Sequence, residues 1–531
     1  MKTGDRQTGF AFCCRFLQIC SHMSFRFSTL VSGSRPTIAT SRLQSNPERS
    51  RHVLPGVPGG CVVYTKGAKP IWIVLLALAA LCALTRTAVA ADAMSPAKRY
   101  LITDSGAVAD GQTVNTKAIQ SAIDRCASNG GGVVVVPKGT FMSGALFFKP
   151  GVNLLVEKDA VLKGTANPDD YPQINTRWEG VEREWTSAFL NFENMTNVQV
   201  TGEGTIDGSG DLWMQRGGFG GRGRRGGTGQ SLAPTNAPAI PQAVATVTTN
   251  FSANATAANT VPRRGRPRLI CFSNCRDVRI AGLHLQRQAV WCLHLLYCQR
   301  VVVDNLNIRA IERIPSSDGI DVDSCRDVQI SRCNIDCNDD DIAIKCGKDA
   351  DGLRVNRPSE NITISDCTIG AGGGITMGSE VSGSIRHVLV QRCKFTGTSQ
   401  PARFKSQPSR GGVIEDIVYR DIQMDNTRQA VEFDMAWRMV PPIATPAKVL
   451  TVVRNVQFIN FSGTAQSGGA IHGLKDSPIQ NVKFENCKFT AQRGLVLENV
   501  KDPDLSGLEL KVAEGEPIIR RHAAAQPAAQ P

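Results

Sequence analysis

A short phrase recurs along most of the chain, and it limits the fold more than any other feature. Two clear copies are residues 274–280 (NCRDVRI) and 324–330 (SCRDVQI). Weaker copies begin near residues 194, 297, 384, 415, 454 and 479, so neighbouring copies are mostly 20 to 40 residues apart. Short strands that repeat at such a period indicate a solenoid, in which each repeat buries its apolar face against the next.

Strands dominate the repeats, and only residues 115–130 show a clear helical pattern. Asn115 can cap that helix, an apolar face includes Ile119 and Ile123, and Gly130 can end it. We therefore predict an all-β, right-handed parallel β-helix whose exposed N-terminal end is covered by this helix. Many cysteines occupy the same place in the phrase, which favours stacking in the core over disulfides, although no pairing can be assigned.

The composition divides the chain into parts. We place the β-helix domain at residues 98–515, interrupted at about 216–266 by an Arg/Gly-rich tract that we predict to be a disordered insert. Residues 516–531 are predicted to be a disordered tail. An Arg/Gly tract can bind RNA, but we expect no nucleic-acid partner because the chain carries an export signal.

That signal lies within residues 1–90, which we interpret as an N-terminal extension followed by a signal peptide at about 66–90. The apolar run 71–84 follows Lys66 and Lys69 and precedes the small residues 87–91, so cleavage is expected near Ala90. An uncleaved membrane anchor is the alternative. These 90 residues hold 11 Lys or Arg and two acids, so the formal charge of +13 falls to +4 beyond them, and the basic composition says little about the partners of the mature protein.

Residues 316–347 form the first candidate active site, because they hold eight acidic residues in 32 positions. Clustered carboxylates repel one another, and such a cluster is typical of a site that uses the charge. Asp318 and Asp339 are 21 residues apart, about one coil, and neighbouring strands lie ~4.8 Å apart. Asp318, Asp339 and Asp340 can therefore face one site, and the alternative is an Asp ladder that caps turns or binds Ca²⁺.

The motifs SSDGID (316–321), SCRDVQI (324–330) and NDDDIAIKCG (338–347) resemble the central motifs of glycoside hydrolase family 28, the polygalacturonases and related pectin hydrolases. The resemblance covers about residues 99–500 outside the Arg-rich insert. It implies a parallel β-helix fold and inverting hydrolysis, for which a spacing of ~6.5–9.5 Å between the two carboxyl groups is expected. It also implies that Asp339 is the general acid and that Asp318 and Asp340 position the attacking water.

Further residues match motifs of this family. Arg403 and Lys405 resemble its R-I-K motif, and by alternation they share one face, where they suit a uronic acid carboxylate. A solvated basic face is the alternative. His294 lies in a W-x-x-H match and is predicted to line the substrate groove, although a core histidine is equally consistent with the pattern.

The main departure from the family pattern lies at residues 371–380 (AGGGITMGSE), where polygalacturonases have a G-H-G histidine that supports the carboxylates. Rhamnogalacturonan hydrolases of the family resemble this chain in that run of glycines, but they do not usually keep the R-x-K pair. Asp341, which replaces the family's Cys, is interpreted as an extra carboxylate.

We predict a secreted or periplasmic monomer that hydrolyses a galacturonate-containing pectic polymer without a cofactor or metal. The alternatives are a rhamnogalacturonan hydrolase, a Ca²⁺-dependent pectate lyase on the same fold, and a non-catalytic β-helix that binds carbohydrate.

Overall fold

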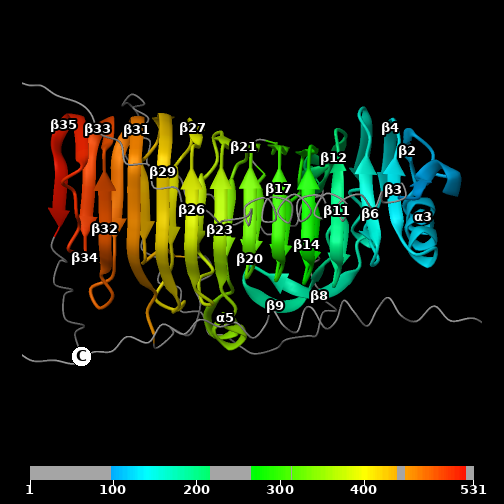
Figure 1. Ribbon diagram of the computed structural model, residues 1–531, viewed down its shortest axis with the longest axis horizontal. Coiled ribbons are helices and arrows are strands. Elements are labelled where there is room, and N and C mark those ends of the chain that lie inside the picture. Colours follow the sequence, from blue (N-terminus) through cyan, green and yellow to red (C-terminus); the bar gives the residue numbers. More distant parts are fainter. Residues whose placement is uncertain (1–96, 216–264, 312–313, 439–448, 522–531) are drawn as a thin grey trace, which may run out of the picture. The chain divides into compact units, whose positions relative to one another are not determined.

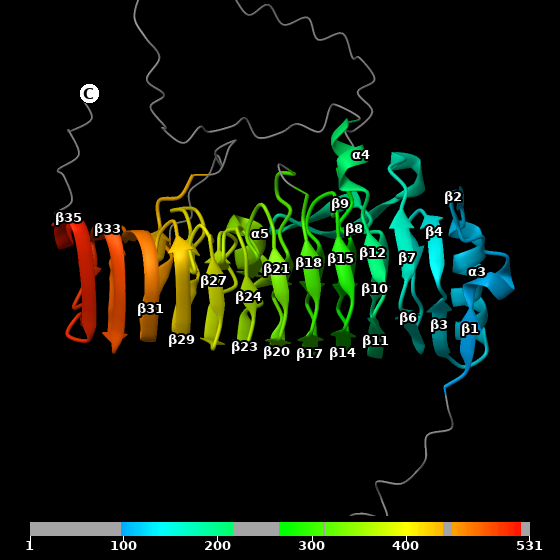
Figure 2. The same cartoon turned by 90° about the horizontal axis from the view of Figure 1, so that it is seen from above.

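A computed structural model of the protein describes residues 97–215, 265–311, 314–438 and 449–521. They form a right-handed parallel β-helix, as predicted, in which strands of successive coils pair in register. Figure 1 shows the coils stacked in a row from α3 to β35, and Figure 2 shows the same row from above. The predicted extension at 1–90, with its signal peptide, lies outside the described residues, as does almost all of the predicted insert.

The strands lie on three faces. Face 1 holds β1 Arg99–Leu101, β3 Gly132–Val136, β6 Val152–Val156, β11 Thr196–Gly202, β14 Arg276–Ala281, β17 Gln299–Asp304, β20 Arg326–Ser331, β23 Ser359–Ser365, β26 Ile385–Gln391, β32 Ile479–Glu485 and β34 Val500–Lys501. Face 2 holds β2 Asp110–Val114, β4 Gly139–Ser143, β7 Ala160–Gly164, β12 Thr205–Asp207, β15 His284–Gln286, β18 Asn307–Arg309, β21 Asn334–Asp336, β24 Thr368–Ile369 and β27 Lys394–Thr396.

Face 3 holds β5 Leu146–Phe147, β10 Leu190–Glu193, β13 Ile270–Ser273, β16 Leu293–Leu296, β19 Ile320–Asp323, β22 Ile342–Lys345, β25 Ile375–Gly378, β28 Ala402–Lys405 and β30 Val431–Asp434. In the last coils, longer strands bend from one face to another: β29 Val413–Thr427, β31 Val452–His472, β33 Cys487–Glu498 and β35 Leu508–Arg521. One antiparallel hairpin, β8 Gln173–Trp178 with β9 Val181–Thr186, runs across several coils (Figure 1).

The helices are few and short. The predicted capping helix is present as α3 Thr116–Ser128, which lies at the N-terminal end of the row (Figure 1) and packs on β1, β3 and β5. The others are η1 Ile102–Ser105, η2 Pro168–Asp170, α4 Gly210–Gln215 and α5 Asp349–Val355. Asn115 precedes α3, but its side chain bonds to Val108 and Thr113 rather than to the helix, so the predicted side-chain cap is wrong.

The interior is built from ladders of like residues, because parallel register places equivalent positions of successive coils against one another. Cys275, Cys298 and Cys325 follow one another at the starts of face 1 strands. All 12 described cysteines are buried and unpaired, which confirms core stacking. Asparagines form a second kind of ladder: Asn274 Nδ2 donates to Asn194 Oδ1 at 2.6 Å, and both residues adopt the left-handed conformation that Asn tolerates.

The predicted start of the C-terminal tail is wrong. β35 continues through Arg521 and pairs with β33, so residues 516–521 belong to the last coil. The last strand of the row is exposed on its outer side, so it can carry polar residues such as Glu514 and Glu516. These residues interrupt the apolar alternation from which a strand is predicted. Residues 522–531 lie outside the described part of the chain. Among the described residues, no helix is long and apolar enough to cross a membrane.

Aromatic stacking gives a test of the packing between coils. Phe272 on β13 is fully buried and stacks on Phe192 of the previous coil at 4.4 Å, and Phe192 stacks on Phe148 at 4.2 Å. We expect Phe272→Ala to lower the free energy of unfolding by about 3–5 kcal/mol, because it leaves a cavity between the coils. Denaturant unfolding followed by circular dichroism measures this.

The control for that measurement is Val108→Ala, because Val108 is 48% exposed. It should change the free energy of unfolding by no more than about 0.5 kcal/mol. An unchanged unfolding midpoint for Phe272→Ala would contradict the stacking described above.

Candidate active site

Three carboxylates converge where two turns lead into face 3. Asp318 precedes β19, and Asp339 and Asp340 precede β22, the next strand along the row. The backbone N–H of Gly319 donates to the carbonyl oxygen of Asp340 at 3.0 Å, which stacks one turn on the other. One carboxylate oxygen from each of the three aspartates lies within 4.8 Å of the other two. The structure thus brings together the three predicted catalytic residues.

Asp340 is surrounded by donors. Its buried carboxylate accepts hydrogen bonds from Lys405 Nζ at 2.6 Å and Thr376 Oγ1 at 2.8 Å, and Arg403 Nη1 lies 3.4 Å away. Burial opposes ionisation, but the charges of Lys405 and Arg403 outweigh it and lower the pKa of Asp340 to about 2. Asp340 is therefore ionised at any pH near neutrality.

Asp318 has a different environment. It is buried, and its Oδ2 lies 3.3 Å from the ammonium of Lys345. Burial and the nearby charge of Asp321 raise the pKa of Asp318 well above its usual range. Asp339 is only half-buried, and its carboxylate makes no ion pair within the described residues. The three aspartates therefore differ in burial and in charge partners, which is how one site can supply both an acid and a base.

Arg403 and Lys405 both lie on β28 and point to the same side, as alternation predicts. Lys405 contacts Asp340 and lies 5.3 Å from the ring of Trp437. Arg403 donates through Nε to Glu432 on the next strand at 2.8 Å. Both predicted substrate-binding cations thus stand beside the carboxylates, each already paired with an acid of the protein.

His294 does not line this site, so its predicted contact with substrate is wrong in this structure. Its side chain is fully buried, with Nδ1 2.6 Å from Arg268 Nη1 and Nε2 3.5 Å from Asp323 Oδ2. Burial lowers the pKa of His294 to about 4, so the ring is neutral. His294 lies on the outer side of β16, but the β8–β9 hairpin contributes Arg177, which pairs with Asp323 at 2.8 Å and helps to bury this region.

Sequence reasoning gave no role to Lys345 or Asp321. The Lys345 ammonium lies 3.4 Å from Asp321 Oδ1 and 3.6 Å from Glu380 Oε2, in addition to its contact with Asp318. Burial raises the pKa of Asp321 to about 7. One sequence feature could have revealed this cluster: Lys345 ends the buried strand 342–345, and burying an ammonium without an acidic partner would cost free energy.

The run of glycines at 372–374 fits closely around the carboxylates. A Cβ at Gly373, the position aligned with the missing histidine, would lie 2.7 Å from Asp340 Oδ1. A Cβ at Gly372 would collide with the carboxylate of Asp341. Asp341 is fully buried and accepts the N–H groups of Cys337 at 3.2 Å and Gly374 at 3.0 Å, and burial raises its pKa well above the usual range. Asp341 is therefore a structural residue that occupies the space beside the glycines.

The same three carboxylates are the one group of potential metal ligands found among the described residues. A divalent cation there would have to displace Lys345 from Asp318 and Lys405 from Asp340, and it would lie near Arg403. These resident cations already pair with two of the three carboxylates, so the donor set does not fit a bound Ca²⁺.

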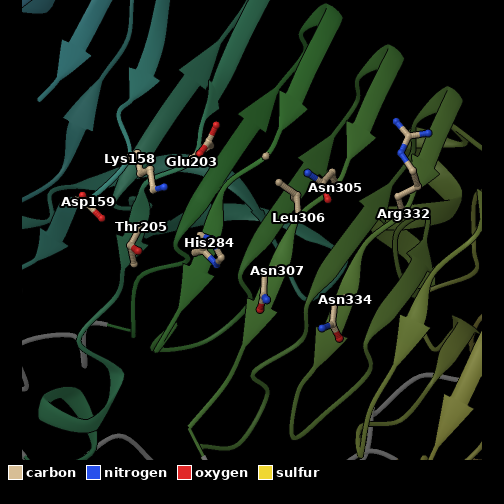
Figure 3. Close-up of a pocket in the computed structure, with 11 residues that line it drawn as sticks. Lys158, Asp159, Glu203, Thr205, His284, Asn305, Leu306, Asn307, Arg332 and Asn334 are labelled. Carbon is tan, nitrogen blue, oxygen red and sulfur yellow. The ribbon is translucent and has the colours of Figure 1, made fainter. Parts of the chain in front are cut away.

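A separate hollow of about 790 Å³ lies on the flank at the starts of face 2 strands (Figure 3). His284, Asn307 and Asn334 point into it from β15, β18 and β21, together with Lys158, Asp159, Glu203, Thr205, Asn305 and Arg332. It contains none of the three converging carboxylates, and its mixed charges favour no single ligand.

The fold places the chain among the parallel β-helix proteins. Comparison of the sequence with protein-family models identifies the family within this class. Residues 247–506 match the model of glycosyl hydrolases family 28, and residues 101–214 match a model described as rhamnogalacturonase A/epimerase, pectate lyase-like. These matches and the relatives below support glycosyl hydrolases family 28 for this chain.

Individual relatives agree with this assignment. A probable polygalacturonase of Vitis vinifera is 29% identical over 341 residues, 62% of this chain and 61% of that protein. An exo-poly-alpha-D-galacturonosidase of Dickeya chrysanthemi is 28% identical over 62% of this chain and 56% of its own length. The chain thus matches about three fifths of these relatives. The crystal structure of an exopolygalacturonase from Thermotoga maritima superposes with a TM-score of 0.61 at 25% identity, covering 80% of this chain and 91% of that one.

The close fit at Gly373 predicts that restoring the family's histidine is harmful. We expect Gly373→His and Gly373→Ala each to reduce turnover about 100-fold, because the new Cβ displaces Asp340 from Lys405 and Thr376. Steady-state kinetics on the substrate proposed below measures this.

Gly370→Ala is the matched control, since its Cβ would lie 2.6 Å from Asp336 Oδ1, an aspartate paired with Arg309 outside the site. It introduces the same kind of clash and should leave turnover nearly unchanged. Higher activity in Gly373→His than in the native protein would contradict the proposed fit.

Proposed function

We propose that the protein is a secreted or periplasmic glycoside hydrolase that cleaves α-glycosidic bonds of galacturonate-containing pectic polysaccharide with inversion. The observation that carries the proposal is the convergence of Asp318, Asp339 and Asp340 within 4.8 Å, next to Arg403 and Lys405. The family match and the names of the relatives supply the substrate class. Export rests on the apolar run 71–84 and the small residues after it.

The geometry suggests a division of roles. Asp339, the most exposed of the three, donates a proton to the glycosidic oxygen as the bond from that oxygen to the anomeric carbon breaks. Asp318 and Asp340 orient a water molecule, whose oxygen forms the new bond to the anomeric carbon on the opposite face. The proton of that water passes to Asp340, the carboxylate that is ionised at neutral pH.

The substrate carboxylate can assist this step. Arg403 is partly exposed beside Asp340, and a guanidinium can bind a uronate through two hydrogen bonds. A bound uronate would share the positive charge of Arg403 and Lys405 with Asp340. The basicity of Asp340 would then rise when substrate is present, which links recognition of galacturonate to activation of the water.

A rhamnogalacturonan hydrolase is the second candidate function. It is favoured by the match of residues 101–214 to the rhamnogalacturonase-related model and by the glycine at position 373. The intact pair of Arg403 and Lys405 favours galacturonan. A Ca²⁺-dependent lyase fits less well, because lysines already occupy the positions around the carboxylates where a cation would bind.

Activity is tested by reducing-end release from polygalacturonate and, separately, from rhamnogalacturonan, with EDTA present. We expect release from polygalacturonate that EDTA does not change, and a loss of at least about 100-fold in Asp339→Asn and Asp340→Asn, because each removes an acid or base. Asp327→Asn is the control: it lies in the same acidic stretch, but it pairs with Arg326 and Asn361 away from the site.

Each other outcome selects a different function. Release from rhamnogalacturonan alone selects the second candidate, and products that absorb in the ultraviolet and disappear with EDTA indicate a lyase. Binding of either polymer without turnover would identify a protein that only binds carbohydrate.

The stereochemistry of cleavage needs its own test, because the nearest carboxylate oxygens are closer than the ~6.5–9.5 Å expected for an inverting pair. Our preference for inversion rests on two ion-paired carboxylates, Asp318 and Asp340, which can hold a water between them. Proton NMR during early turnover should show a first product whose anomeric configuration is opposite to that of the substrate. A first product that retains the anomeric configuration of the substrate would instead indicate that Asp318 or Asp340 acts as a nucleophile.

A further inference from the structure

Lys345 is the only basic side chain that reaches Asp318 within the described residues. It ends β22 and is 5% exposed, and its ammonium lies 3.3 Å from Asp318 Oδ2. Asp321 from β19 and Glu380 from the turn after β25 hold the same ammonium at 3.4 Å and 3.6 Å. The ring of Trp291, which precedes β16 two coils before, lies 4.5 Å away and closes the remaining side. Lys345 therefore sits in a fixed socket made by three coils.

We propose that Lys345 is a positioning residue for the reaction: it fixes the carboxylate of Asp318 in the orientation that holds the attacking water. Asp321 and Glu380 act through it, because they hold the ammonium in place. This inference rests on the proposed hydrolase function and adds residues to it that no motif assigned.

The placement of the two buried lysines supports this role. Lys405 contacts Asp340, and Lys345 contacts Asp318, so each of the two water-orienting carboxylates has an ammonium of its own. Asp339, the proposed acid, pairs with neither lysine. An ammonium donates to the carboxylate it contacts and fixes its orientation, and the charge of Lys345 opposes the burial that raises the pKa of Asp318. The lysines thus separate the residues that orient water from the one that donates a proton.

A purely structural role explains the arrangement less well. The neighbouring buried pair, Arg177 with Asp323, already links the β8–β9 hairpin to this face. In the described chain, the ion pairs and the ring contact of the Lys345 side chain are all with face 3 and its adjoining turns. Its acidic partners are Asp318, Asp321 and Glu380, and the last two have no other cation within salt-bridge distance among the described residues. Without Lys345, three buried carboxylates would lie together unneutralised, and they would take up protons.

Lys345→Met tests the proposal, because it removes the ammonium and keeps most of the side-chain length. Activity of the full chain is measured as kcat and KM on polygalacturonate, beside Lys345→Arg and the native protein. We expect Lys345→Met to lower kcat about 100-fold with KM changed less than about threefold, because orientation of the water is lost and substrate contacts remain. Lys345→Arg should recover part of the lost kcat, since it keeps the charge.

Two controls separate positioning from folding. Lys394→Met makes the same change at an exposed lysine on face 2 and should leave kcat and KM unchanged. Glu380→Gln keeps the shape of the socket and should lower kcat less than Lys345→Met does, again at nearly constant KM. If Lys345→Met does not fold, Lys345→Arg and Glu380→Gln decide the question by the same split between kcat and KM.

The outcomes distinguish this inference from the function on which it rests. If the native protein releases no reducing ends, the proposed function fails and this inference fails with it. If the native protein is active, and the folded Lys345→Met or Glu380→Gln variant keeps native kcat or loses activity only through KM, the hydrolase assignment stands and the positioning role of Lys345 is overturned.

Discussion

In-register parallel stacking of the coils is the constraint on which the rest of the structure depends. Neighbouring strands lie ~4.8 Å apart, so a residue type that recurs at one place in the repeat becomes a continuous row. Inward rows give the buried cysteine and phenylalanine ladders. In the turns before face 3, the same stacking brings Asp318 and Asp340 from different coils into one cluster. One geometric rule therefore makes both the core and the site.

This rule also explains how much the sequence could predict. The repeated phrase predicted the solenoid and its buried cysteines, and the place of Asp318, Asp339 and Asp340 in successive turns predicted that they converge. Position within a repeat is local information, and it determines on which side of a strand a residue lies. Arg403 and Lys405 were placed correctly for the same reason, because alternation along β28 fixes their common direction.

In-register stacking does not determine which segments cover the outer side of a strand. For this reason the prediction that His294 contacts substrate was wrong. His294 does point away from the coil, yet Arg268 and the hairpin residue Arg177 belong to segments more than 20 residues upstream and help to bury the region. No periodicity in residues 173–186 shows where that hairpin will lie. The exposed last strand was missed for the opposite reason: its polar outer side resembles a tail because no further coil covers it.

The concentration of acids at this site raises a problem that stacking alone cannot solve. Asp318, Asp321, Asp340 and Glu380 are all buried, and ionised carboxylates at such distances repel strongly. Lys345 beside Asp318 and Lys405 beside Asp340 offset this repulsion, and Arg403 adds a third positive charge near Asp340. Burial raises the pKa of Asp318 and of Asp321, and the charges of neighbouring acids add to the rise, so the cluster can hold a proton. The cations beside Asp340 keep it ionised, whereas Asp339 has no cationic partner among the described residues. A site that must both give and take a proton needs carboxylates with such different environments.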